Sequence, residues 1–440
     1  MKKITSLSFV PYGLLLLWIS VAACNSLRQQ KSSVPEASLR FVRSDTVLDR
    51  SSMRSRLTAS EPHVVINRKN PRNLVGGSIL DNVYRSHDGG QTWQHGRLQS
   101  PYGVFGDPVL VSNDEGRIYY FHLATGAKDS GHRLEGIVMQ YSDDEGRTWS
   151  PGVLIGKNGT KQQDKPWVAI DRRTGRMAVA WTEFDQYGST DPRHRSRIRI
   201  SFSSDRGRTW TPAVTLSDTE GDCRDDDMTP EGAVPLFDNS GNVYVVWAYD
   251  GRIWFDRSLD GGKTWGTDRA IARQEAGWNF DIRGIYRANG LPNFLRDANE
   301  HFYVVFGDKS ATSGGDIKLV SSTDRGQTWT PVRTLGPREK DQFFPAATFD
   351  ESSGILEILF YDRSRSEGVQ TAVRLMCYDP LCGTVRLFRV NKKDFTPVKF
   401  PFFGDYIGID TYRGKTACIW TEIHNGGTSV HVAMLESGSK

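Results

Sequence analysis

The chain contains the octapeptide SHDGGQTW at residues 86–93 and repeats its pattern as SDDEGRTW (142–149), SSDRGRTW (203–210), SLDGGKTW (258–265) and STDRGQTW (322–329). The acid in the third position of each copy recurs at intervals of 55 to 64 residues. A unit of four strands with their turns fits this period. The pattern therefore predicts one repeat architecture along most of the chain.

The residue types of the octapeptide indicate a tight turn. Ser and Asp side chains accept hydrogen bonds from turn backbone, Gly adopts positive φ, and the Trp ring buries a large apolar surface beside the turn. The segment CYDPLCGTV (377–385) keeps Asp379 and a glycine but lacks the Trp, and we interpret it as a decayed sixth copy.

Each repeat begins with a predicted β-hairpin, as in DPVLVSNDEGRIYYFHL (107–123) and KPWVAIDRRTGRMAVAWTEF (165–184). Seven such hairpins begin near Pro62, Asp107, Lys165, Glu231, Gly290, Phe344 and Gly404. The last unit supplies only three strands, and an N-terminal strand within LRFVRSD (39–45) can complete it and remove the exposed sheet edges. We therefore predict an all-β propeller of four-stranded blades, seven by this count with six as the alternative, in a single domain over residues 38–440.

The N-terminus has the features of an export signal. Lys2 and Lys3 precede the apolar stretch 14–19, and small residues precede Cys24. This pattern predicts a lipoprotein signal peptide over residues 1–23, a lipid-carrying Cys24 and a tether over residues 24–37, with a plain signal peptide as the alternative. The expected location is the outer membrane or the cell surface, with membrane contact through the lipid alone.

The composition argues against several partners and cofactors. The 56 Lys and Arg residues against 52 Asp and Glu give a net charge of +4 without a dense basic run, so we expect no nucleic-acid partner. The nine His residues form no H-E-x-x-H pattern, and the cysteines form no C-x-x-C pair. We therefore expect no metal and no cofactor. A Cys377–Cys382 disulfide is one of several open pairings.

Polar residues precede the predicted inner strands of the blades. In a propeller these segments meet at one mouth of the central channel, where aromatic faces beside carboxylates suit sugar rings. The predicted substrate-binding residues are Asp107, Asp164, Lys165, Trp278, Arg283, Arg287 and Asp405. The run Asp225–Asp227 is interpreted as a solvated acidic loop, with a calcium site as the weaker alternative.

The octapeptide pattern S-x-D-x-G-x-T-W resembles the Asp-box of the sialidase superfamily and of other β-propellers. The resemblance implies that the boxes lie at the outer rim, between the third and fourth strands of a blade. PEGAVPLFDNSGNVYVVWA (230–248) is similar to the segment that holds a catalytic glutamate, which implies Glu231 as base to a tyrosine nucleophile. FFGDYIGI (402–409) is similar to the segment of that nucleophile, which implies Tyr406, and GSILDNVYRSHDGG (77–90) implies Asp81 as acid/base.

The sequence departs from the three-arginine pattern with which sialidases hold a sugar carboxylate. The place of the first arginine reads Ser60-Glu61-Pro62, and Arg283, Arg287 and Arg363 are substitutes outside the family's motifs. We therefore expect a sialidase-like glycoside hydrolase acting on a glycan. The alternatives are a non-catalytic glycan-binding or scaffold propeller, and a polysaccharide lyase that uses Tyr406 as base and Arg287 to neutralise a uronate.

Overall fold

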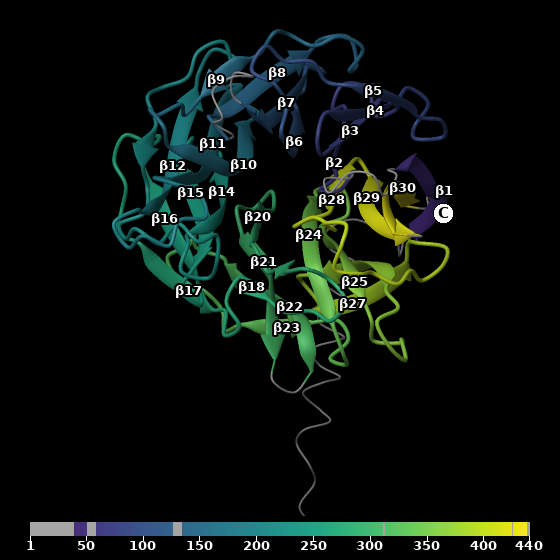
Figure 1. Ribbon diagram of the computed structural model, residues 1–440. Helices are drawn as coiled ribbons and strands as arrows, with labels where there is room; N and C mark the ends of the chain where they lie inside the picture. The colour runs from purple at the N-terminus through teal and green to yellow at the C-terminus, as the bar shows by residue number, and fades with distance from the viewer. Residues whose placement is uncertain (1–38, 51–58, 126–133, 311–312, 425, 438–440) are drawn as a thin grey trace, which may run out of the picture.

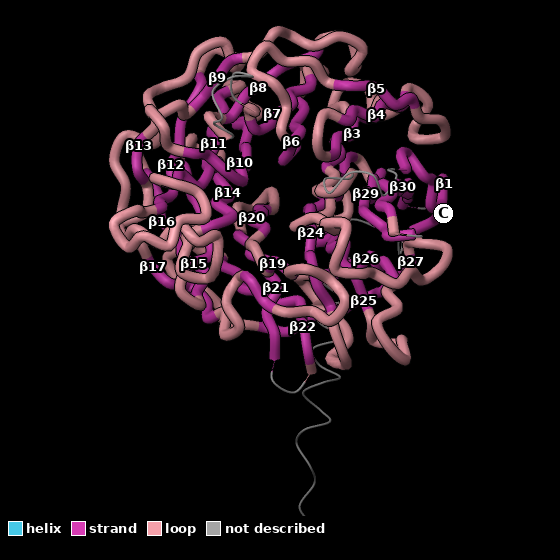
Figure 2. Tube along the Cα trace, viewed as in Figure 1, coloured by secondary structure: helices cyan, strands magenta, loops and turns pink. Residues whose placement is uncertain are grey.

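The computed structural model describes residues 39–50, 59–125, 134–310, 313–424 and 426–437, and these residues form strands and turns without a helix (Figure 2). Seven four-stranded antiparallel sheets stand around a common axis, with one two-stranded ribbon beside them (Figure 1). These described residues therefore contain no helix long and apolar enough to span a membrane. The prediction of a seven-bladed all-β propeller is confirmed, and the six-blade alternative is wrong.

Each blade runs from an inner strand at the axis to an outer strand at the rim. Blade one comprises β2 (His63–Ile66), β3 (Leu74–Ser78), β4 (Asn82–Ser86) and β5 (Gln94–Arg97), and blade two β6 (Gly106–Ser112), β7 (Ile118–Leu123), β8 (Ile137–Ser142) and β9 (Val153–Ile155). Blade three comprises β10 (Gln162–Asp171), β11 (Arg176–Phe184), β12 (Ser196–Ser203) and β13 (Val214–Thr215), and blade four β14 (Glu231–Phe237), β15 (Val243–Tyr249), β16 (Arg252–Ser258) and β17 (Arg269–Arg273).

The ribbon of β18 (Asn279–Phe280) and β19 (Ala288–Asn289) follows blade four. Blade five comprises β20 (Asn293–Arg296), β21 (Phe302–Ser310), β22 (Gly314–Ser322) and β23 (Arg333–Leu335), and blade six β24 (Gln342–Asp350), β25 (Ile355–Asp362), β26 (Ala372–Asp379) and β27 (Thr384–Arg389). Blade seven comprises β28 (Gly408–Tyr412), β29 (Lys415–His424), β30 (Gly427–Ser437) and the N-terminal β1 (Leu39–Arg50).

Blade seven closes the ring with strands from both ends of the described chain. β1 pairs antiparallel with β30, with Leu39 opposite Ser437 and Val47 opposite His431 (Figure 1). The inner strands contact one another in the order β2, β6, β10, β14, β20, β24, β28 and back to β2. The predicted completion of the last blade by residues 39–45 is therefore confirmed.

The hydrophobic core is divided among the interfaces between blades. Seven buried apolar clusters each join two consecutive blades. Along β7, Tyr119 and Phe121 pack toward blade three, whereas Ile118 and Tyr120 pack toward blade one. This follows from the two-residue period of a strand, which turns successive side chains to opposite faces of its sheet.

The five boxes connect the third and fourth strands of blades one to five, as the resemblance implied. In the first box the Ser86 hydroxyl donates to Asp88 Oδ1 at 2.8 Å, the Gly90 N–H donates to Ser86 Oγ at 2.9 Å, and the Thr92 hydroxyl donates to Asp88 Oδ2 at 2.6 Å. The other four boxes repeat these three bonds. The decayed copy around Asp379 also lies between third and fourth strands, in blade six.

Two further sequence predictions concern cysteines and the N-terminus. Cys377 is buried and carries a free thiol, so the short Cys377–Cys382 loop is not formed. The predicted signal peptide, the tether and Cys24 lie outside the described residues and stay predictions.

Candidate functional site

The inner strands begin with an irregularity that recurs around the ring. The ladder shifts register at the start of β6, β10, β14 and β24, and the bulges contain Asp107, Lys165, Gly232 and Phe344 at φ between +48° and +66°. Glu61, just before β2, has φ +52°. Non-glycine residues persist in this region only where surrounding contacts hold them, and such residues concentrate at functional sites.

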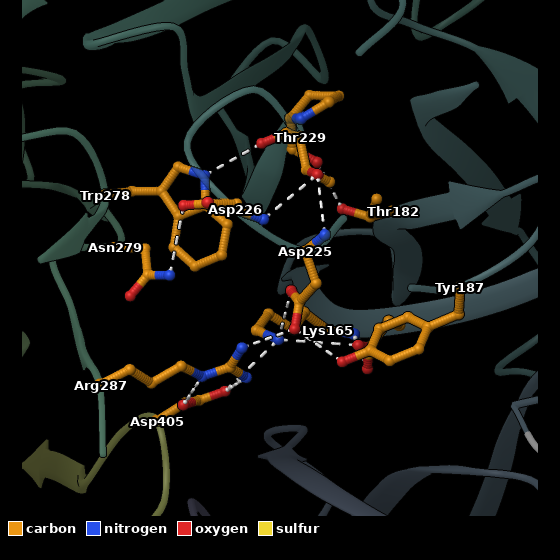
Figure 3. A network of polar contacts seen from close by, with 12 residues as sticks. Lys165, Thr182, Tyr187, Asp225, Asp226, Thr229, Trp278, Asn279, Arg287 and Asp405 are labelled. Atoms are coloured by element: carbon orange, nitrogen blue, oxygen red, sulfur yellow. Dashed lines mark hydrogen bonds and ion pairs between the residues drawn. The ribbon is translucent and has the colours of Figure 1, made fainter. Parts of the chain in front are cut away.

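Lys165 lies at the centre of the polar groups that these bulges bring together (Figure 3). Its Nζ lies 3.6 Å from Asp164 Oδ2, 3.7 Å from Asp225 Oδ1 and 3.4 Å from Asp405 Oδ2. The ammonium group is buried, and these carboxylates hold the pKa of Lys165 well above its usual range despite its desolvation. Asp164 precedes Lys165 on β10, whereas Asp225 and Asp405 lie in the connections that lead into blades four and seven, so Lys165 ties blade three to both of them.

Arg287 reaches the same group from the ribbon that precedes blade five. Its Nη1 donates to Asp225 Oδ2 at 2.5 Å and its Nε donates to Asp405 Oδ1 at 2.8 Å, while Nη2 also contacts Asp405 (Figure 3). The Tyr187 hydroxyl donates to Asp225 Oδ2 at 2.6 Å. The interpretation of residues 225–227 as a solvated loop is therefore wrong for Asp225, which is buried and accepts from two partners.

Glu231 opens β14 beside this network and is fully buried. Both of its carboxyl oxygens are without a hydrogen-bond partner among the described residues. Burial, together with the charges of Asp225 and Asp164, raises the pKa of Glu231 well above its usual range in spite of the opposing effect of Lys165. The three carboxylates of Asp164, Asp225 and Glu231 lie close enough to hold a cation, but the Lys165 ammonium already neutralises this position.

Tyr406 faces a second set of acids. Its hydroxyl is buried and has no hydrogen-bond partner within the described ranges, and its ring lies 5.9 Å from the ring of Trp167. Burial raises the pKa of Tyr406, and the charges of Asp107 and Glu61 raise it further. Burial also raises the pKa of Asp107 to about 8, so this carboxyl is mostly protonated at neutral pH.

Gly404 makes the approach of these segments possible. It has φ +99°, and a Cβ there would lie 2.9 Å from both Cγ and N of Glu61. The close contact lets the Asp405 N–H donate to Glu61 Oε1 at 3.0 Å. The segment that holds Asp405 and Tyr406 is thereby fixed against the start of blade one.

Of the ten predicted catalytic and substrate-binding residues, seven lie in or beside this cluster: Asp107, Asp164, Lys165, Glu231, Arg287, Asp405 and Tyr406. Asp81 lies in the turn between β3 and β4, where it pairs with Arg97 at 2.6 Å. Trp278 is buried and donates its indole N–H to the Thr229 carbonyl, so a sugar has no access to its face (Figure 3). The Arg283 side chain is exposed, and its carbonyl accepts from the buried Arg363.

Tyr286, Phe400 and Phe402 form an aromatic cluster beside Arg287, which we call the aromatic shelf. The Tyr286 ring lies 5.5 Å from Phe400 and 6.5 Å from Phe402, and the Arg287 guanidinium lies 5.9 Å from the Phe402 ring. Tyr286 and Phe400 are 53% and 68% exposed, which is unusual for large apolar rings. This aromatic shelf offers stacking surfaces next to the charged cluster.

A cavity of about 730 Å³ lies at the opposite mouth of the channel, among turns that join first and second strands. Its lining includes Arg68, Lys69, Asp114, Arg172 and Arg413. All of these except Arg68 are exposed on the same face as the boxes. We place the candidate site at the other mouth, because several buried acids with raised pKa values gather there around Tyr406 and Lys165, whereas only Glu357, bound by Thr411, has a raised pKa beside this cavity.

Tyr187 was not among the predicted site residues, and Glu61 was noted at the place of the missing first arginine but given no role. Tyr187 lies in the connection between the second and third strands of blade three, which opens on the same mouth as the starts of the inner strands. The presence of a polar aromatic residue in such a connection was the one sequence feature that could have indicated Tyr187 as a site residue. Its bond to Asp225 depends on the folding of two separate loops, which no local pattern reveals.

Comparisons with known proteins agree with this architecture. Residues 72–244 match the family described as BNR repeat-like domain. A sialidase of Bacteroides fragilis is 24% identical over 287 residues, which cover 57% of this chain and 48% of the relative, so the chain spans about half the length of the protein it matches.

Two solved structures share the fold. A protein of unknown function from Dyadobacter fermentans is 14% identical, with a TM-score of 0.54 over 91% of this chain and 99% of the other. An ulvan lyase, a polysaccharide lyase, is 13% identical, with a TM-score of 0.54 over 89% of this chain and 95% of the other. At these identities the structures establish the fold alone. The chain thus has a sialidase-like propeller fold with BNR repeats.

Proposed function

We propose that the chain is a glycoside hydrolase of sialidase-like architecture that acts on glycans at the mouth formed by the starts of its inner strands. The observation that carries this proposal is the Tyr406 hydroxyl, which lies without a hydrogen-bond partner among the described residues beside two carboxyls of raised pKa. A phenol becomes a useful nucleophile only where a nearby group takes its proton, and carboxyls of unequal pKa supply an acid and a base.

In the proposed reaction the Tyr406 oxygen attacks the anomeric carbon while the glycosidic bond breaks, and water later releases the sugar. Asp107 gives its proton to the departing oxygen, because its carboxyl is protonated at neutral pH. We prefer Asp107 to Asp81 for this step, since Asp81 is bound by Arg97. Glu231 stays the predicted base for the Tyr406 proton and accepts it in the fraction of molecules whose Glu231 carboxyl is ionised, since burial raises the pKa of this group well above its usual range.

The charges at the site favour a sugar without a carboxylate. A guanidinium that binds a sugar carboxylate uses its bidentate fork, and the fork of Arg287 is occupied by Asp405 and Asp225. Lys165 is likewise surrounded by acids. We therefore propose a neutral or cationic sugar ring, stacked on the aromatic shelf.

A non-catalytic glycan-binding propeller is the second candidate, and the ion pairs of Lys165 and Arg287 favour it. These pairs hold the central acids in a buried network, which is also how a purely structural cluster is built. A polysaccharide lyase needs a cation free to neutralise a uronate, and the engagement of Arg287 makes this the weaker alternative.

The test incubates the protein with a panel of neutral, amino and acidic glycans and follows both new reducing ends and the ultraviolet absorbance of unsaturated products. The proposal expects reducing ends without absorbance, and a loss of about 10²–10⁴-fold in Asp107→Asn. Absorbance would establish the lyase. Binding of a glycan that persists in Tyr406→Phe, with no product from any glycan, would establish the binding propeller.

A further inference from the structure

The second and third strands of blade seven carry a cluster of two histidines and a glutamate that shares no residue with the candidate site. Glu422 and His424 lie near the end of β29, and His431 lies on the neighbouring β30, opposite Trp420. One ligand atom from each of these residues lies within 4.8 Å of the others. Two imidazoles and one carboxylate form a donor set that zinc uses in proteins.

The distances between the donor atoms fit a tetrahedral ion. His424 Nε2 lies 2.7 Å and His431 Nε2 lies 3.8 Å from Glu422 Oε2. With zinc–ligand bonds near 2.0–2.1 Å, two donors on a tetrahedron are separated by about 3.3 Å. The observed distances bracket this value, so a small side-chain movement brings the three donors into place.

In two of these residues, the polar atom that would not bind the ion already forms a hydrogen bond with a neighbouring side chain. The carboxylate of Asp45 on β1 lies 2.6 Å from His431 Nδ1, which leaves Nε2 as the lone-pair nitrogen that accepts from the Ser429 hydroxyl at 2.8 Å. Trp420 Nε1 donates to Glu422 Oε1 at 2.9 Å, and this leaves Oε2 directed at the histidines. A carboxylate behind a ligating histidine is the usual outer support of a zinc site.

Burial gives the cluster one open side. Glu422 and His431 are buried, whereas the His424 side chain is 52% exposed. An ion would enter from the His424 side and keep a water ligand there. The three residues have the spacing E-x-H, followed by a histidine seven residues later across a hairpin. Known zinc-binding sequence motifs do not include this spacing, so a motif search does not predict the site.

We propose that Glu422, His424 and His431 bind a zinc ion that fastens the closure of the propeller ring. The ion joins β29 to β30, and Asp45 connects it to β1, the strand that the N-terminal part of the chain contributes. Zinc binding replaces the hydrogen bond between His424 and Glu422, and the imidazole then carries its proton on Nδ1 while Nε2 binds the ion.

The test measures zinc binding by the chelator-treated full chain with titration calorimetry and follows the thermal unfolding midpoint with and without ZnCl₂. The expected results are one zinc per chain, a raised midpoint, and an intense visible spectrum of tetrahedral type after cobalt substitution. His424→Ala, at an exposed side chain, should fold normally and lose binding. Asp45→Asn should weaken binding about 10–100-fold.

The matched control is His301→Ala, which removes a histidine that pairs with Asp297 at 2.9 Å without a third ligand. It should bind zinc like the wild type. Absence of stoichiometric binding, or binding that survives in both His424→Ala and Glu422→Gln, would overturn the proposal. None of these readouts depends on glycan hydrolysis, so they are independent of the proposed function.

Discussion

Lys165 is the residue on which the central network depends, because three acids from different blades face its ammonium group. Its backbone adopts φ +48°, a region costly for a side chain of this size, by about 1–3 kcal/mol. The ion pairs formed in this position offset that cost. The backbone conformation of Lys165 therefore depends on its ion pairs with the surrounding acids.

Replacing Lys165 by Met should lower the free energy of unfolding by about 3–5 kcal/mol, because it leaves buried carboxylates without their cation. Urea denaturation at neutral pH measures this. Lys161→Met is the control, since Lys161 pairs with Asp185 at 2.8 Å but is one-third exposed, and its loss should cost about 0–1 kcal/mol. Equal effects of the two substitutions would contradict the structural importance of the network.

Asp107 gives the proposed reaction its pH dependence. Burial raises the pKa of this carboxyl to about 8, so the protonated form that donates to the departing oxygen is lost as the pH rises through that value. We expect kcat/KM to fall above pH 8 in the wild type. A pH profile of Asp107→Asn should show no such fall, and a fall near pH 8 that persists in the variant would assign it to another group.

At the scale of the element, the boxes act as contacts between blades as well as turns. The glycine in the fifth position of each box, at φ between +78° and +89°, packs against a side chain of the preceding blade: Met434 for Gly90, Val75 for Gly146, Met139 for Gly207, Phe202 for Gly262 and Phe255 for Gly326. A Cβ at any of these glycines would lie within 2.8 Å of that side chain. The conserved spacing within the octapeptide therefore serves both the hairpin and the interface.

Gly89 and Gly90 separate these two effects within one box. Both have positive φ, but a Cβ at Gly89 meets nothing within 4 Å, whereas one at Gly90 would lie 2.4 Å from Met434 Cγ. Gly89→Ala should cost about 1–2 kcal/mol through backbone strain alone. Gly90→Ala should cost about 1–3 kcal/mol more through overpacking of the interface between blades seven and one, as measured by urea denaturation. If Gly89→Ala and Gly90→Ala lowered the free energy of unfolding equally, the box would have no role in the interface between blades.

The elements were largely predictable from the sequence, because strand alternation and box turns are local. All seven hairpins and the position of every box are confirmed.

The candidate site was predictable from the sequence only in part. Charged residues that precede inner strands indicated Lys165 and Asp405, but the partners of Arg287 come from loops 62 and 118 residues away along the chain. Long-range pairings of this kind leave no periodic signal.

At the scale of the whole molecule, stability depends on closing the ring, because each apolar cluster needs both of its blades. Blade seven is covered at its outer edge by β1 alone. A variant that begins at Ala59 should expose the edge of β30, unfold at a lower temperature and associate through that edge. Light scattering and thermal unfolding, compared with a variant that begins at Leu39, measure both effects. An unchanged midpoint and a monomeric state would show that β1 is dispensable.

The ring also explains how residues from blades far apart in the sequence can act together. Asp107 and Tyr406 are separated by most of the chain, yet burial and charge couple them at one mouth. The nucleophilic role of Tyr406 is the central claim of the proposed function.

Peptide mass spectrometry of the protein, acid-quenched while it hydrolyses the best glycan of the panel, tests that claim most directly. We predict the mass of one glycosyl unit on the peptide that contains Tyr406, and its absence in Tyr406→Phe. A glycosyl unit on another residue, or hydrolysis at the wild-type rate by Tyr406→Phe, would contradict the assignment.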